Sequence, residues 1–206
     1  MEPFILPVNV LVEGPTNEVV VRRILAHSGL PCGIVHGKQG KSYLLDRLPN
    51  YNQAAHFAPW LVVVDLDQDS NCAPPFVEER LPHPARGMAF RVAVRAVEAC
   101  LMADAERIAA FLDVPVNRIP HHPEAELDPK NTLVNLARRS RSVAIREDMV
   151  PRQASGSRVG GGYPGRLIEF VTTANNPWRP GVAAKRSDSL RRCLETVEPL
   201  KTWTQE

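Results

Sequence analysis

The chain has 206 residues, of which 44% are apolar, enough for one core-forming domain or one domain with an appendage. Its formal net charge of +2 excludes a polycation, so any nucleic-acid surface must be local. No run approaches the roughly 18–20 apolar residues of a membrane span, and the first seven residues do not have the pattern of a secretory signal. We therefore expect no membrane contact.

The four cysteines, Cys32, Cys72, Cys100 and Cys193, are widely separated and form no C-x-x-C pair. A zinc site is therefore not expected. This cysteine usage favours a reduced, cytoplasmic protein.

Strand-like and helix-like segments alternate in the first half of the chain. The pattern predicts, in order, a strand over 8–14, a helix over 17–27 capped by Thr16, a strand over 32–36, a helix around 43–48, a loop over 50–59, a strand from Trp60, and a strand over 88–94. Alternation of this kind predicts an α/β fold with a mostly parallel, Rossmann-like central sheet flanked by helices.

The remaining segments are mainly helical or irregular. We expect a helical turn near 78–81, helices over 95–104, 105–112, 131–140 and 187–200, a helix or strand over 166–172, and a mobile glycine-rich loop over 155–165. Asp104 could cap the helix at 105–112. We expect an α/β core over residues 5–115 and a loop-rich, partly helical C-terminal extension over 116–206.

Carboxylates follow two of the predicted strands. The apolar run from Trp60 to Val64 leads directly into Asp65, Asp67 and Asp69, and Glu13 follows the first strand. Ligands of open α/β sheets bind beyond the carboxyl ends of such strands, and oxygen ligands suit Mg²⁺ or Mn²⁺. Glu13 could bind the metal or exchange protons beside it, which suits phosphoryl transfer. The alternative is a solvated acidic turn.

Two segments resemble the TOPRIM domain of topoisomerases, primases and OLD-family nucleases: Val12-Glu13-Gly14-Pro15-Thr16-Asn17-Glu18, and Val63-Val64-Asp65-Leu66-Asp67. The chain is most similar to a TOPRIM-like bacterial family of unknown function. The turn at 37–41, the segment at 98–104 and the tail at 178–190 carry this second resemblance. The TOPRIM likeness spans residues 5–115.

The resemblance implies a Mg²⁺-dependent site for phosphodiester chemistry on nucleic acid, with a nuclease as the leading expectation. Glu13 would be the general acid/base or a metal ligand, Asp65 and Asp67 would hold metal, and Asp69 would assist. Asn17 stands where the family often has an acidic residue, so Glu18 is a candidate substitute. The resemblance also implies a separate ABC-type ATPase subunit and a role in defence against phage or mobile DNA. The alternative function is a non-catalytic module that binds metal or phosphate and regulates a partner.

Three further residues are candidates for the same site. Lys38 and Lys41 follow the second strand and could contact phosphate, with Lys38 as a second catalytic candidate. Their spacing is not that of a P-loop, which argues against an ATPase. Glu98 lies in an apolar stretch, so it is either exposed or paired with a metal or with an arginine such as Arg91 or Arg95.

A local excess of basic residues follows residue 130. Arg138, Arg139, Arg141 and Arg158 could contact nucleic-acid phosphates, with Gly160–Gly162 allowing close backbone approach. The alternative is a solvated, flexible surface. His121 and His122 lie between prolines, and we expect a plain loop there.

Overall fold

The computed structural model describes residues 5–204 and contains a four-stranded parallel sheet in the order β2-β1-β3-β4. The strands are β1 (Val8–Val12), β2 (Cys32–Gly37), β3 (Trp60–Asp65) and β4 (Met88–Ala93). The predicted α/β fold with a parallel, Rossmann-like sheet is confirmed. Because all four strands run the same way, their carboxyl ends meet at one edge of the sheet.

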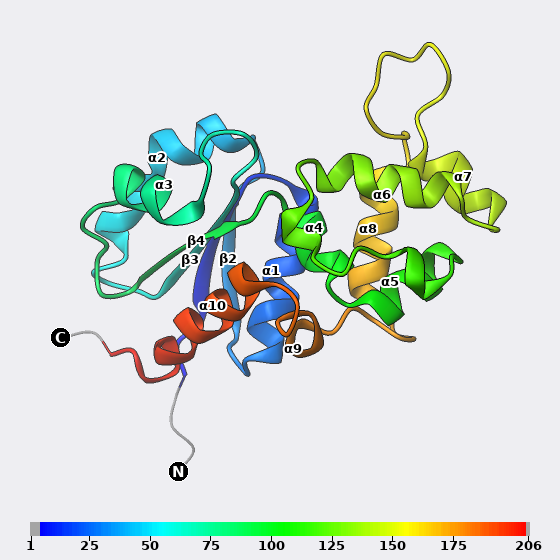
Figure 1. Ribbon diagram of the computed structural model, residues 1–206. Helices are drawn as coiled ribbons and strands as arrows, with labels where there is room; N and C mark the ends of the chain where they lie inside the picture. The colour runs from blue at the N-terminus through cyan, green and yellow to red at the C-terminus, as the bar shows by residue number, and fades with distance from the viewer. Residues whose placement is uncertain (1–4, 205–206) are drawn as a thin grey trace.

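Helices cover both faces of the sheet, and each face has its own hydrophobic core (Figure 1). On one face lie α1 (Pro15–His27) and α10 (Asp188–Val197). On the other lie α2 (Lys41–Ala54) and α3 (Ala73–Arg80). β3 is buried along its whole length, which explains why its sequence is an unbroken apolar run rather than an alternating one.

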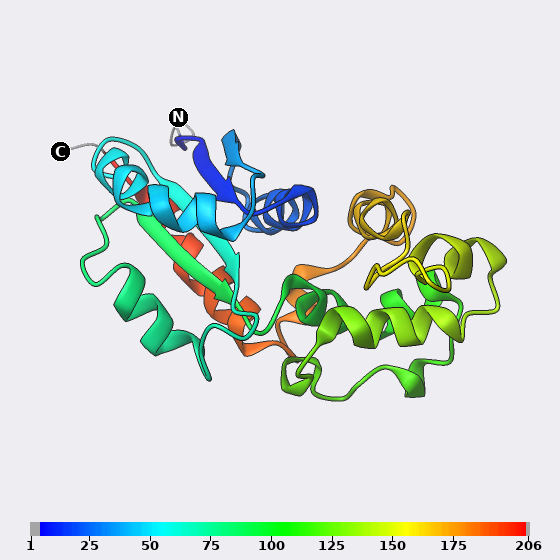
Figure 2. The ribbon, with the colours of Figure 1, turned by 90° about the horizontal axis from the view of Figure 1, so that it is seen from above.

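The chain leaves the sheet after β4 and builds a helical lobe beside it (Figure 2). The lobe contains α4 (Val97–Met102), α5 (Ala105–Leu112), α6 (Pro129–Arg138), α7 (Val143–Met149) and α8 (Tyr163–Thr172), with the 3-10 turns η1 (Val116–Arg118) and η2 (Pro123–Ala125). The chain then returns through α9 (Pro180–Ala183) to α10 and η3 (Glu198–Thr202). The expected division between residues 115 and 116 falls inside this lobe, between α5 and η1.

Some helix boundaries differ from those expected. α1 begins at Pro15 with Gly14 at its N-cap, so Thr16 is not the cap. Proline is favoured in the first helical turn because its missing N–H would be unpaired there anyway. α2 continues past Pro49 through much of the expected loop, because its buried Leu44 and Leu48 pack on the sheet. α7 was not predicted.

No helix within residues 5–204 combines the length and apolar character needed to cross a membrane.

Asp104 joins the helical lobe to the returning chain. Its fully buried carboxylate accepts hydrogen bonds from the backbone N and Nε of Arg179, at 3.0 and 2.9 Å, and from Nη2 at 2.6 Å. The expected capping bond to α5 is therefore absent, since the carboxylate is used elsewhere. Next to it, buried Trp178 donates from Nε1 to the carbonyl of Cys100 at 3.2 Å.

We expect Arg179→Met to destabilise the protein by about 2–4 kcal/mol, because it leaves the Asp104 carboxylate buried without its cation. Urea unfolding measures the change. Arg191→Met is the control, since Arg191 forms only exposed pairs with Asp188 and Glu195, and its loss should leave the midpoint unchanged. Equal effects of the two substitutions would contradict the assigned role of Asp104.

Candidate functional site

Glu13 and Asp65 lie together at the carboxyl-end edge of the sheet. Glu13 directly follows β1, Asp65 ends β3, and these strands are neighbours in register, with Val12 opposite Val63. The backbone N–H of Asp65 donates to Glu13 Oε1 at 2.7 Å. The sheet thus brings together two carboxylates that are 52 residues apart in the sequence.

Asp65 is 3% exposed and is held by groups from three other elements. Its Oδ1 accepts hydrogen bonds from Asn17 Nδ2 at 3.3 Å and from the backbone N–H of Val97 at 3.0 Å. Its Oδ2 lies 3.6 Å from Lys130 Nζ, which reaches the site from the first turn of α6. Lys130 is the closest cation to this carboxylate that the described chain provides.

Glu98 adds a third carboxylate from the helical lobe. It is only 2% exposed, so it is not on the surface, and its hydrogen-bond partner is neither Arg91 nor Arg95. Tyr163 Oη donates to its Oε1 at 3.3 Å. Its Oε2 is buried and has no hydrogen-bond partner among the described residues. We call Glu13, Asp65 and Glu98 the carboxylate cluster.

Burial and mutual repulsion make these carboxylates hard to ionise. Burial and the charge of Asp65 raise the pKa of Glu13 from 4.5 to about 7. The same two causes raise the pKa of Glu98 to about 7. Burial also raises the pKa of Asp65, against the opposing effect of Lys130. Lys130 itself is partly buried, which lowers its pKa, but the neighbouring carboxylates Glu98 and Asp65 shift it upward overall.

Asp67 and Asp69 form a second, more exposed group. Lys41 Nζ lies 2.5 Å from Asp67 Oδ2 and 2.9 Å from Asp69 Oδ2. Asp67 has a positive φ of 50°, so the chain turns sharply immediately after β3. The predicted Asp65 and Asp67 therefore differ in surroundings, because one is buried in the cluster while the other is paired with a lysine near the surface.

Lys38 and Glu18 pair with each other beside this site. Lys38 Nζ lies 3.1 Å from Glu18 Oε2, and Arg22 Nη2 lies 2.9 Å from Glu18 Oε1. Successive helical residues point about 100° apart, so Asn17 and Glu18 face different surroundings. Asn17 contacts Asp65, whereas the Glu18 carboxylate binds these two cations.

The cluster has the donor chemistry of a divalent-cation site without being preassembled as one. Within residues 5–204, no group of three or more His, Cys, Asp and Glu side chains is arranged to hold a metal. However, half-buried Glu13 and the buried Asp65 and Glu98 all have a raised pKa, and Glu98 has an oxygen without a hydrogen-bond partner. Such a set of carboxylates fits a hard cation that would neutralise it. Glu13 and Asp65 are the first candidates to hold it, and Asp67 would have to release Lys41 to join them.

The predicted basic surface is largely internally paired. Arg158 forms an ion pair with Asp128, Arg141 Nη2 lies 3.1 Å from Asp113 Oδ1, and Arg138 Nη1 donates to Asn135 Oδ1 at 2.9 Å. Arg139 is exposed at the C-cap of α6. These residues lie in the helical lobe, and the acidic partners of Arg141 and Arg158 offset the positive charge that these two residues would offer to a phosphate.

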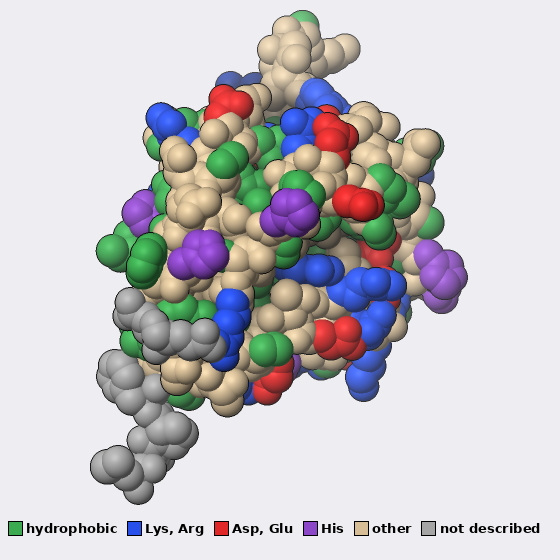
Figure 3. Space-filling view, turned by 90° about the vertical axis from the view of Figure 1, so that its left-hand side faces the viewer, with side chains coloured by type: hydrophobic (Ala, Val, Ile, Leu, Met, Phe, Trp, Pro, Cys, Tyr) green, Lys and Arg blue, Asp and Glu red, His purple; other side chains and the backbone are tan. Residues whose placement is uncertain are grey.

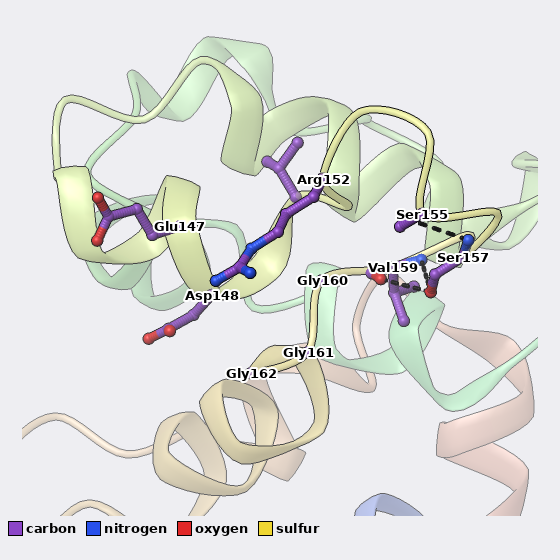
Figure 4. A pocket seen from close by; sticks show the side chains of 10 residues that line it. Glu147, Asp148, Arg152, Ser155, Ser157, Val159, Gly160, Gly161 and Gly162 are labelled. Atoms are coloured by element: carbon purple, nitrogen blue, oxygen red, sulfur yellow. Dashed lines mark hydrogen bonds between the residues drawn. The ribbon is translucent and has the colours of Figure 1, made fainter.

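The glycine loop packs against α7 and encloses a cavity of about 420 Å³ (Figure 4). Gly160 N and Gly162 N donate to the carbonyls of Met149 and Asp148, at 3.0 and 2.9 Å. A Cβ on Gly160 would lie 2.2 Å from the Asp148 carbonyl oxygen. These glycines therefore let the loop backbone lie close to α7. Their two N–H groups donate to α7 carbonyls and are not free to bind phosphate.

Comparison of the chain with protein-family models, with curated proteins and with solved structures finds no match.

Sequence reasoning missed three residues of the site: Asn17 as a partner of Asp65, Lys130 and Tyr163. Asn17 had a local signal, because it lies in the first turn of a helix that follows a strand ending in Glu13. Lys130 and Tyr163 had none. They contact carboxylates 65 positions away in the sequence, and nothing near either residue distinguishes it from a surface Lys or a core Tyr.

We expect Glu13→Gln to stabilise the metal-free protein by about 1–3 kcal/mol at pH 8 and to have little effect near pH 4. The pKa of Glu13 is raised from 4.5 to about 7 in the folded state. The folded protein therefore binds more protons than the unfolded chain between these values, and this residue's contribution to stability falls as the pH rises through that window. Gln keeps the acceptor for the Asp65 N–H without the charge.

Chemical denaturation at several pH values between 4 and 8 tests this. Glu195→Gln removes an exposed carboxylate paired with Arg191 and serves as the control. If the effect of Glu13→Gln on the free energy of unfolding is constant across the pH range, or equals that of the control, ionisation of Glu13 does not destabilise the folded protein.

Proposed function

We propose that this protein carries out divalent-metal-dependent phosphodiester chemistry on nucleic acid, as a nuclease that uses Mg²⁺ or Mn²⁺. The observation that carries the proposal is the contact between Glu13 and Asp65 at the ends of two adjacent parallel strands, with buried Glu98 beside them. Packing like charges together is costly without a cation, and such arrangements are concentrated at functional sites. The Glu-Gly and Asp-x-Asp segments that resemble TOPRIM domains supply these residues.

The residues of the chain have distinct roles under this proposal. Asp65 would hold the ion, which when bound supplies positive charge beside the phosphate, and Glu13 would be either a second ligand or the general acid/base. Glu13 has a pKa of about 7 and can both accept and release a proton near neutral pH. Because Glu13 Oε1 accepts a hydrogen bond from the Asp65 N–H, Glu13 Oε2 is the oxygen that would exchange the proton. Asn17 and Val97 fix the orientation of Asp65.

Two lysines can neutralise the substrate. Lys130 contacts Asp65, and Lys41 contacts Asp67 and Asp69, so cationic groups flank the carboxylates on two sides. A phosphate that entered between them would exchange these ion pairs for contacts with its own oxygens. Lys38 is paired with Glu18 and would take part only after releasing it.

The second candidate function is a non-catalytic module that binds metal or phosphate and regulates a partner. The observation that favours it is the neutralisation of Asp67 and Asp69 by Lys41 without a metal. A separate ABC-type ATPase subunit fits either function, and its role in defence against phage or mobile DNA remains part of the proposal taken from the resemblance alone.

Degradation of labelled DNA and RNA, single- and double-stranded, in the presence of Mg²⁺ or Mn²⁺ tests the nuclease. We expect Glu13→Gln and Asp65→Asn to reduce the cleavage rate by about 100-fold or more, the range found for removal of a general acid/base. Glu195→Gln, on the exposed side of α10, should cleave at the wild-type rate.

Calorimetric titration with Mn²⁺ separates the two functions. Binding that is lost in Asp65→Asn, together with cleavage, supports the nuclease. Binding with no cleavage of any substrate favours the regulatory module. Unchanged cleavage by Glu13→Gln would show that the chemistry takes place elsewhere.

A further inference from the structure

A second cavity lies beside the free edge of the sheet, away from the carboxylate cluster. It has a volume of about 640 Å³ and lies between α3, the edge strand β4 and the start of α10. Figure 1 shows α3 and α10 on opposite sides of β4. None of Glu13, Asp65 and Glu98 lines it. Its volume falls within the range of small-molecule sites, about 300–1,000 Å³.

The wall formed by α3 is apolar except for Glu78. Pro74, Val77, Leu81 and Pro82 line that side, and Val92 and Val94 of the β4 segment extend it. A cavity of this kind receives the apolar body of a ligand, since covering such surface contributes roughly 25 cal/mol per Å².

Arg91 places an unbalanced cation in the wall of this cavity. The residue lies on β4, and its Nε is buried with no hydrogen-bond partner. No ion pair or hydrogen bond links Arg91 to any other residue in 5–204. Several side chains within residues 5–204 have a buried polar atom without a hydrogen-bond partner. Among these side chains, only Arg91 lines the cavity. Arg91 as a whole is half-buried, and a carboxylate is the acceptor whose geometry matches a guanidinium.

The other charged groups around the cavity already have partners or are solvated. Glu124 accepts hydrogen bonds from Ser187 Oγ and Ser189 Oγ and from two backbone N–H groups, and Asp188 is paired with Arg191 and Arg192. Glu78 is exposed to solvent. Arg91 is therefore the cation of this cavity that a ligand can neutralise. On the face of the molecule that Figure 3 shows, Lys and Arg side chains lie beside Asp and Glu side chains.

We propose that this cavity binds a small organic acid, with an apolar body against α3 and a carboxylate on the guanidinium of Arg91. The site is separate from the proposed nuclease centre and does not depend on it. The ligand class follows from two features together, the apolar wall and the unpaired arginine.

Isothermal titration of the full-length protein with decanoate, and with its neutral analogue decanamide, tests the proposal. Both molecules have the same apolar chain and a carbonyl acceptor, so their difference reports the negative charge. We expect decanoate to bind about tenfold or more tightly than decanamide. Arg91→Met should abolish this preference, and Arg91→Lys should retain part of it, because Lys keeps the charge but not the two-pronged geometry.

Arg139→Met is the matched control, since it removes one exposed positive charge outside the cavity. It should leave the preference for decanoate unchanged. Perturbation of the backbone amide resonances of Val77 and Val92 by decanoate would place the ligand in the cavity. The proposal is overturned if neither compound binds, if both bind equally, if Arg91→Met retains the preference while folded by circular dichroism, or if the perturbed resonances lie elsewhere.

Discussion

The burial of Asp65 is the constraint around which the rest of the site is arranged. An ionised carboxylate that is 3% exposed must be compensated, and three separate elements supply the compensation. α1 provides Asn17, the start of α4 provides the Val97 N–H, and α6 provides Lys130. The helical lobe is therefore part of this site, since it supplies two of the three partners of Asp65.

The same constraint separates the acidic residues into two kinds. Glu13 and Glu98 are each partly or fully removed from water and lie near the charge of Asp65. These two effects raise the pKa of each carboxyl to about 7. Asp67 and Asp69 lie only two and four positions beyond Asp65, but the turn at Asp67 brings them to the surface, where Lys41 neutralises them. A short acidic motif thus contains one residue suited to a desolvated centre and two suited to exchange with solvent or substrate.

The sequence was sufficient for the parts of the fold that depend on local pattern. The apolar run at Trp60–Val64 predicted a doubly buried strand, and parallel topology allowed Glu13 and Asp65 to be neighbours at one edge, as the pairing of β1 with β3 makes them. It was insufficient where packing decided the outcome. The helix was expected around residues 43–48 with a loop over 50–59, but burial of Leu44 and Leu48 sustains α2 as far as Ala54. Glu98 could be recognised as costly to bury, while its partner Tyr163 could not be identified from a separation of 65 residues.

Glu98 and Arg91 show how polar groups without partners can be interpreted in physical terms. Each is a charged side chain with a buried atom for which the described chain supplies no partner. Native proteins leave few such atoms, because each unsatisfied group costs about 1–3 kcal/mol, and more when it is charged. The two carry opposite charges and lie in different surroundings, one among carboxylates and the other beside an apolar cavity. We have proposed a cation in the surroundings of the first and an anion in those of the second. Under the two proposals, one small α/β chain with an added helical lobe would present two binding sites of opposite charge, one at the carboxyl ends of β1 and β3 and the other beside β4.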